Sequence, residues 1–582
     1  MEQSKSNLNI VISLKLKIFL LSGQLLVSCD KKENGADIII TNATIYTVDG
    51  KNPWAEAIAI KDGKIIYVGA KENVQPLAAS NTQLLDFGEM FVMPAFYDMH
   101  CHLLQAVLDQ NKYCKIQATT LDETIKKIIA CKNSQSDREW IMGAGYYPEL
   151  FGINGPNKTL LDSIIPDKPA FFFDIGYHNI WVNSKALELS KINKTTIYTD
   201  NPSWLVKDDH GEPTGFLKEE ARNLVLRNTK SSEYTFNNLD SVFHTMAMLL
   251  GENGVVSIQD PSSFDLRLLE LYHHADSIGL IETFNISFGL PYKSGAKSSI
   301  NTLRDLDSIS TKFASPNVAT KTVKLFLDGT LESETAAVLS PYLSGQSGTL
   351  LIEPKNLNAI VQKLDSSGYQ LHIHATGDHA IRAALDAFEF AIKVNGKNDN
   401  RHQIAHANLP HMDDIKRFGQ LNVISNMQLW WMDNSEYYTK LLRSIIGNEN
   451  VKKLHPFKSF VENGPVCVGS DYPVTSMNPL EAIQKALTRK EINSKHAPLS
   501  PEQNLSLSEA IYAYTMGGAY AQHVNKVAGS LEVGKSADFI VLDKNLFKIP
   551  LEEIYKTSII YTYYKGAKVY VNERRLIDTT SN

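Results

Sequence analysis

The middle of this 582-residue chain alternates short apolar strands with amphipathic helices, and that alternation restricts its fold more than any other feature. Residues 369–374 are expected to form a strand, and Gly377-Asp378 leads from it into a helix over residues 380–392 with apolar positions at helical spacing. Residues 465–471 are nearly continuously apolar, which is typical of a parallel strand covered on both faces. Such repetition predicts an α/β protein built on a (β/α)8 barrel of the TIM type.

Both ends of the chain are rich in short strands instead. β-branched runs occupy residues 37–48, 57–60 and 64–68, with turn signals at Asp49-Gly50 and Asp62-Gly63, and similar runs return at 537–543, 559–563 and 567–571. We therefore expect a small β-sandwich formed from both termini, residues 36–93 and 526–582. The barrel would occupy residues 94–525, with an insertion between its early strands.

The first residues have the pattern of a targeting segment. Lys15 and Lys17 precede an apolar run over residues 18–28 that is too short to span a bilayer, which predicts a signal peptide over residues 1–28. Leu26-Val27-Ser28-Cys29 resembles a bacterial lipobox, which would make Cys29 a lipidated N-terminus followed by a polar tether over residues 29–35. The protein would then be anchored in the cell envelope, on the periplasmic or outer-membrane side. The alternative is an ordinary secretory signal and a secreted protein.

Charge and cysteine content limit the kinds of partner and of cross-link that we expect for this protein. A net charge of −6 and a pI near 6.3 give no sign of a nucleic-acid surface. Beyond Cys29 only four cysteines remain, too few for a disulfide scaffold, and whether Cys114 and Cys131 pair stays open. Cys101 is expected to be a small buried apolar residue. We expect a small-molecule substrate, and the sequence leaves open whether the chain forms a homodimer.

Candidate metal ligands lie at the expected strand ends. His100 and His102 follow the apolar run 91–97, and residues two apart in an extended chain point to one face. Polar residues recur in or after later strands, namely Lys324, His374, His406 and Asp471. The carboxyl ends of barrel strands share one face, so these residues are expected to form one constellation there.

At this point the sequence resembles the metal-dependent amidohydrolase superfamily, and most closely the amidohydrolase family 3 branch that includes N-substituted formamide deformylases. The resemblance covers nearly the whole mature chain. Its further segments are residues 178–187, 211–219, 254–260, Asp328-Gly329, 374–378 and 529–538.

The resemblance implies roles for these residues. His100, His102, His374 and His406 would be imidazole ligands of one or two divalent ions, zinc first, with iron or manganese as alternatives. Lys324 matches a position that can carry a carboxylated lysine bridging two metals; the alternative is an ion pair with Asp328. Asp471 would contact the metal and its water, act as general base and return the proton to the leaving amine; the alternative is a helix N-cap.

Other polar and aromatic residues have two interpretations each. His178 either binds substrate or makes a structural loop hydrogen bond. Gln428 and Trp430 are expected to contact substrate, although the Trp430-Trp431 pair would equally suit core packing. His372 is expected one layer below the metal, as a core group or a support for a ligand. His402 should lie deeper still.

The chain also departs from the usual family pattern. Ala405 precedes His406 where Glu is frequent, Pro94-Ala95 stands where Pro-Gly is usual, and Glu332 and Glu334 add negative charge near the expected mouth. We predict a metal-dependent hydrolase that attacks a non-peptide amide or formamide-like C–N bond through metal-bound hydroxide. The alternatives are a deaminase of a heterocyclic amine on the same site, and a binding lipoprotein without turnover.

Overall fold

The computed structural model describes residues 35–575 except 111, 153, 200, 230–237, 262–265, 293–301, 433 and 435. The expected signal peptide, Cys29 and all of the expected tether but Gly35 lie outside the described residues. None of the helices in the described part of the chain is both long and apolar enough to cross a membrane.

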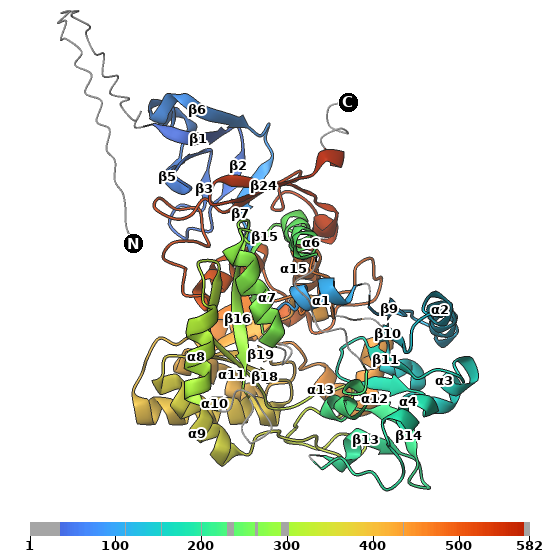
Figure 1. The fold of residues 1–582 in the computed structure, drawn as a ribbon. Helices are drawn as coiled ribbons and strands as arrows, with labels where there is room; N and C mark the ends of the chain where they lie inside the picture. Colours follow the sequence, from blue (N-terminus) through green and yellow to red (C-terminus); the bar gives the residue numbers. More distant parts are fainter. Residues whose placement is uncertain are drawn as a thin grey trace, which may run out of the picture.

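Eight parallel strands form the central sheet (Figure 1). In sheet order they are β21 (Val466–Val468), β20 (Ile424–Met427), β19 (Gln403–His406), β18 (Gln370–Ala375), β17 (Val318–Phe326), β16 (Asn285–Pro291), β15 (Val255–Asp260) and β8 (Phe96–Asp98). The two edge strands meet, because the backbone N–H of Met99 donates to the carbonyl oxygen of Val468 (2.8 Å) and Cys101 bridges to Tyr472. The sheet is therefore a barrel, and the predicted fold class is confirmed.

Helices follow most of these strands. They include α6 (Leu239–Glu252), α7 (Leu266–Ser277), α8 (Leu303–Phe313), α9 (Pro354–Ser366), α10 (Asp378–Asn395), α11 (Met412–Leu421), α14 (Phe457–Asn463) and α15 (Pro479–Thr488). In α10 the predicted apolar positions Ile381, Leu385 and Phe388 are fully buried, and the helix ends where Gly396 adopts a φ of +82°, a conformation that glycine reaches without steric cost. The amphipathic pattern of the sequence thus directs this helix onto the sheet.

An inserted unit separates β8 from β15. Its sheet has the order β13 (Leu205–Lys207), β14 (Pro213–Leu217), β12 (Ile180–Val182), β11 (Ala170–Asp174), β10 (Ile141–Tyr146) and β9 (Cys114–Lys115). Helices α2 (Leu121–Ser134), α3 (Lys158–Ile164) and α4 (Ser184–Leu189) belong to the same unit. A disulfide joins Cys114 to Cys131, with Cα atoms 5.7 Å apart. The pairing of Cys114 with Cys131, which the sequence left open, is therefore present as a cross-link within the insertion.

The chain termini build two further sheets above the barrel, where blue and red strands lie together (Figure 1). One sheet has the order β5 (Lys64–Gly69), β4 (Ala57–Lys61), β1 (Ala36–Thr41) and β6 (Ala78–Asp86). The other has the order β24 (Ala567–Val571), β23 (Ile559–Tyr564), β22 (Phe539–Leu542), β7 (Phe91–Pro94), β2 (Thr44–Tyr46) and β3 (Trp54–Ala55). Because β7 pairs with β22, the two ends of the chain share one sheet.

Candidate metal centre

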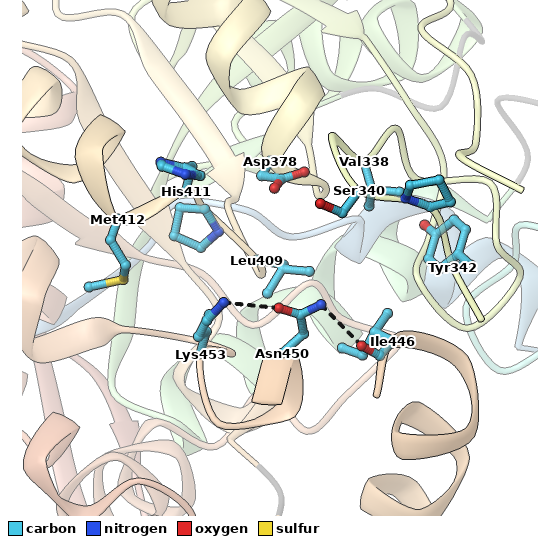
Figure 2. Close-up of a pocket in the computed structure, with 12 residues that line it drawn as sticks. Val338, Ser340, Tyr342, Asp378, Leu409, His411, Met412, Ile446, Asn450 and Lys453 are labelled. Atoms are coloured by element: carbon cyan, nitrogen blue, oxygen red, sulfur yellow. Dashed lines mark hydrogen bonds between the residues drawn. The ribbon is translucent and has the colours of Figure 1, made fainter. Parts of the chain in front are cut away.

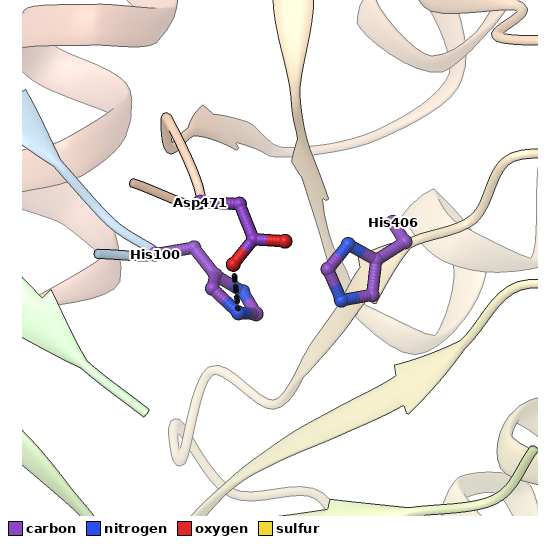
Figure 3. A group of neighbouring side chains, drawn as sticks. All are labelled: His100, His406 and Asp471. Atoms are coloured by element: carbon purple, nitrogen blue, oxygen red, sulfur yellow. Dashed lines mark ion pairs between the residues drawn. The ribbon is translucent and has the colours of Figure 1, made fainter. Parts of the chain in front are cut away.

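Three buried side chains from three parts of the barrel converge at the carboxyl ends of its strands (Figure 3). One potential ligand atom from each of His100, His406 and Asp471 lies within 4.8 Å of the others. Nε2 of His100 is 3.4 Å from Oδ1 of Asp471. The structure thus brings together three of the residues that the sequence nominated as ligands.

Backbone contacts hold the first and last of these residues together. The N–H of Asp471 donates to the carbonyl oxygen of His100 (2.6 Å). A Cβ on Gly469 would lie 2.4 Å from the His100 nitrogen, so only glycine allows this approach. Asp98 accepts from both the N–H and the hydroxyl of Ser470, at 2.9 and 2.6 Å. The helix N-cap interpretation of Asp471 is wrong, since α15 is capped by Asn478.

Two of the three residues have left-handed backbones. His406 has a φ of +76° and Asp471 a φ of +55°. This conformation is costly for residues with a Cβ, and it concentrates where the surroundings force a side chain into a functional position. The strained backbone positions thus coincide with two of the three candidate ligands.

His102 extends the group on its exposed side. Its Nε2 is 3.4 Å from the same Asp471 oxygen, while its buried Nδ1 has no hydrogen-bond partner in the described residues. The histidine pair does not end the strand as expected, because β8 stops at Asp98. The chain nevertheless continues beside its neighbours, with the N–H of Cys101 donating to Gln259 and that of His102 to Tyr472.

His374 lies beside His406, with ring centroids 4.5 Å apart. Its Nε2 is 3.2 Å from the carbonyl oxygen of Gly329. A carbonyl can only accept, so Nε2 carries the hydrogen and Nδ1 keeps the lone pair that a cation requires.

Lys324 is buried, and its Nζ is 4.6 Å from the ring centroid of Phe326. The alternative ion pair with Asp328 is not formed. Asp328 instead accepts hydrogen bonds from the backbone N–H groups of Ala337, Thr376 and Gly377. Burial lowers the pKa of Lys324 to about 7, which leaves much of the amine uncharged near neutral pH.

The donor set fits a divalent cation. Burial lowers the pKa of His374 to about 3 and those of His100 and His406 well below 6.5. These imidazoles are therefore neutral and carry free lone pairs. Neutral imidazoles and a carboxylate form the nitrogen and oxygen donor set that suits zinc, iron or manganese.

The residues after β20 surround His406. Oε1 of Gln428 is 3.0 Å from Nδ1 of His406, so the buried Gln428 holds a candidate ligand. Trp431 stacks on the His406 ring, with centroids 5.1 Å apart and planes 1° apart. Trp430 instead contacts α15, with Lys485 Nζ 3.6 Å from its ring and its indole N–H donating to Glu481. The ring that lies against the histidines is therefore Trp431, and the sequence alone does not distinguish it from Trp430.

His178 reaches this region from the insertion. Its ring centroid is 5.6 Å from that of His374, and its Nδ1 is 2.7 Å from Oε2 of Glu219. Oε1 of Glu219 accepts a hydrogen bond from Thr335 (2.7 Å), in the loop after β17. Burial lowers the pKa of His178, but the charge and hydrogen bond of Glu219, together with the charge of Asp174, outweigh burial, and the net shift is upward. The structural hydrogen bond of the second interpretation is thus present, and it leaves Nε2 for another role.

His372 and His402, the two histidines expected below the metal, have different surroundings. Nε2 of His372 is 3.0 Å from Nδ1 of His100, so this side chain supports a candidate ligand directly. His402 stacks on Phe388 and its Nε2 is 2.8 Å from Oδ1 of Asp365. His402 precedes β19 and therefore packs against helices α9 and α10, away from the candidate ligands.

A separate cavity of about 210 Å³ opens beside this face (Figure 2). It lies between residues 338–342, the starts of α10 and α11, and the helical segment that holds Ile446, Asn450 and Lys453. None of the nominated metal ligands lines it, so it is distinct from the histidine group.

The barrel and its strand-end histidines define an α/β barrel with a candidate metal centre. The structure resembles that of an uncharacterized metal-dependent hydrolase from Pyrococcus horikoshii OT3, with a TM-score of 0.67 and 24% identity over 88% of this chain and 99% of that one. A similar hydrolase from Pyrococcus furiosus gives a TM-score of 0.64 at 23% identity, over 88% of this chain and all of the other. At these identities the likeness concerns the fold.

Sequence comparison adds the family. The amidohydrolase family model matches residues 83–570, and the chain belongs to this family. It is 28% identical to protein LONG AFTER FAR-RED 3 of Arabidopsis thaliana over 92% of both chains. It is 26% identical to the N-substituted formamide deformylase of Arthrobacter pascens, over 92% of this chain and 98% of that protein. The predicted family is confirmed, and a hydrolase is the class that it supports.

Proposed function

We propose that the protein hydrolyses the C–N bond of a non-peptide amide, of which an N-substituted formamide is the first candidate. The observation that carries the proposal is the convergence of His100, His406 and Asp471 at the mouth of the barrel. His102 and His374, and Lys324 as a carboxylated bridge, would complete the set that holds one or two divalent ions. When bound, such ions acidify a water molecule and polarise the scissile carbonyl.

The side chains then have distinct tasks. Asp471 takes a proton from the attacking water as the water oxygen bonds to the carbonyl carbon, and returns a proton to the nitrogen as the C–N bond breaks. His178, held by Glu219 at 2.7 Å, donates from Nε2 to a substrate oxygen. Water and amide are thereby converted to acid and amine, which for a formamide are formate and the free amine.

Asp471→Asn tests this assignment because it preserves size but removes the proton acceptor. General base catalysis is typically worth about 10²–10⁴-fold in rate, so kcat should fall by at least that factor while metal content stays near normal. His100→Asn should lose both metal and activity. His402→Asn, a buried histidine away from the cluster, is the matched control and should retain both.

The assay should screen formamides and other amides for released acid, and heterocyclic amines for released ammonia. Ammonia from a ring amine would favour the deaminase alternative, and a stoichiometric metal without turnover on any amide would favour the binding protein. Retention of most of the wild-type kcat by Asp471→Asn would show that another residue is the base.

We also propose that the mature protein is anchored in the bacterial envelope through Cys29. The disulfide between Cys114 and Cys131 supports an oxidising compartment, where such bonds persist. Cys29→Ser should move the protein from the membrane fraction to the soluble fraction, and equal release of both forms would exclude the anchor. The homodimer stays a prediction.

A further inference from the structure

The barrel interior beneath the histidines is unusually polar. Interiors of such barrels are filled mainly by bulky branched residues. Here five buried side-chain amides form one connected hydrogen-bond network, namely Gln259, Gln370, Gln403, Asn426 and Gln428. We call them the amide chain. Burying an amide costs free energy unless its donors and acceptors are paired. These five amides are paired with one another and with their neighbours, and we asked what such a network does.

Gln370 determines the direction in which hydrogen bonds are donated along the amide chain. Its Nε2 donates to the backbone carbonyl oxygens of Arg401 (2.9 Å) and Ala521 (2.8 Å). Carbonyl oxygens cannot donate, so the amide cannot be reversed without facing oxygen to oxygen. Its Oε1 therefore faces inward and accepts from Nε2 of Gln403 (3.0 Å) and Nε2 of Gln259 (3.4 Å).

One arm leads from Gln259 to His100. Because Nε2 of Gln259 donates to Gln370, its Oε1 is the atom that faces Nδ1 of His372, at 3.2 Å. Nδ1 of His372 must then carry the hydrogen, which leaves a lone pair on Nε2. That lone pair accepts from Nδ1 of His100 at 3.0 Å. His100 consequently keeps its own lone pair on Nε2, the atom 3.4 Å from Asp471.

The other arm leads from Gln403 to His406. Oε1 of Gln403 accepts from Nδ2 of Asn426 (2.9 Å), which also donates to the carbonyl oxygen of Met99 (2.7 Å) and so has a backbone anchor of its own. Oδ1 of Asn426 accepts from Nε2 of Gln428 (3.3 Å). Oε1 of Gln428 then accepts from Nδ1 of His406 (3.0 Å).

We propose that the amide chain is a positioning device that fixes His100 and His406 in the Nδ1–H tautomer, so that both present the Nε2 lone pair to the cation. Three backbone carbonyls, those of Met99, Arg401 and Ala521, set every amide, and the amides set both imidazoles. The relevance to metal binding rests on the proposed function, but the tautomers are a property of the metal-free protein. Groups that orient metal-bound histidines typically change metal affinity by about 10–100-fold.

The decisive variant is Gln370→Met, which touches neither histidine. It removes the anchor of the arm that leads to His100 and leaves Gln259 free to reverse, whereas the Met99 carbonyl still anchors Asn426 in the other arm. In metal-free full-length protein labelled with ¹⁵N-histidine, His100 should change from Nδ1–H to a mixture of tautomers, and His406 should keep its hydrogen on Nδ1. Their signals are assigned with His100→Asn and His406→Asn. A long-range ¹⁵N–¹H correlation spectrum reads the protonated nitrogen without any substrate.

Two further variants each interrupt one arm of the amide chain. His372→Leu should alter only His100, and Gln428→Met only His406. Thr322→Val is the control, because the Thr322 hydroxyl bonds to Gln259 and Gln370 in the same network but sets no direction. Chelator competition should show zinc affinity about 10–100-fold lower for Gln370→Met and nearly unchanged for Thr322→Val.

Two results would overturn the proposal. One is a wild-type protein in which His100 or His406 carries its hydrogen on Nε2. The other is a folded Gln370→Met protein in which His100 remains in the wild-type tautomer. If Gln370→Met does not fold, Gln428→Met alone decides the His406 arm in the same way. An absence of hydrolytic activity would contradict the proposed function and leave these spectra interpretable.

Discussion

Glu219→Gln should weaken the attachment of the insertion to the barrel. The Glu219 carboxylate bonds His178 within the insertion and Thr335 in the loop after β17, each at 2.7 Å. Burial alone would raise the pKa of Glu219, but the charge and hydrogen bond of His178, with the hydrogen bond of Thr335 and the charge of Arg222, outweigh burial and lower the pKa to about 2. Against the ordinary value of 4.5, at 1.36 kcal/mol per pH unit, this corresponds to about 3 kcal/mol of stability.

The contributions of Glu219 and His178 to the stability of the fold depend on pH with opposite signs. The lowered pKa of Glu219 stabilises the fold above pH 4.5, and this contribution is lost as the pH falls towards 2. The raised pKa of His178 stabilises the fold below 6.5, and that contribution is lost as the pH rises through the raised value. The difference between wild type and Glu219→Gln should therefore be largest between pH 4.5 and 6.5.

Urea unfolding at about pH 5.5, repeated at about pH 3 and pH 9, measures this difference. Glu220→Gln is the matched control, because it changes the same charge one residue away, where the carboxylate is partly exposed and 3.8 Å from Arg222. That variant should change the unfolding free energy by less than about 1 kcal/mol. Equal losses for both variants, or a loss for Glu219→Gln that does not vary with pH, would refute the buried charge pair.

Two further substitutions probe neighbouring features. Gly329→Ala would place a Cβ 2.1 Å from the Thr335 hydroxyl and 2.2 Å from Oε1 of Glu219, so urea unfolding should show a loss of about 1–3 kcal/mol, whereas Gly50→Ala, which meets nothing within 4 Å, should be nearly neutral. Cys131→Ser opens a cross-link between residues 17 apart and should destabilise the insertion by about 3 kcal/mol, seen in its tryptophan fluorescence. Thiol labelling of the unreduced, denatured wild type should reach Cys101 and Cys467 but not Cys114 or Cys131, and labelling of all four would exclude the disulfide.

The sequence by itself determined the barrel and the face on which its chemistry lies. Apolar runs of strand length alternating with amphipathic helices have few stable arrangements other than a parallel sheet covered by helices. In such a sheet all the carboxyl ends lie on one face. His100, His374, His406 and Asp471 could therefore be nominated from local patterns alone, although their partners could not.

Only the tertiary structure decided which side chains pair across the barrel. The contacts of His372 with His100, 272 residues apart, and of Thr335 with Glu219, 116 apart, depend on the stagger of the strands and the point of closure. Local periodicity gives the face of a strand but not the depth at which its residues meet those of distant strands. The same limit applies to Trp430 and Trp431, because the short helix after β20 turns one ring onto α15 and the other onto His406. The amide chain required the whole barrel, since three backbone carbonyls from separate segments fix its direction.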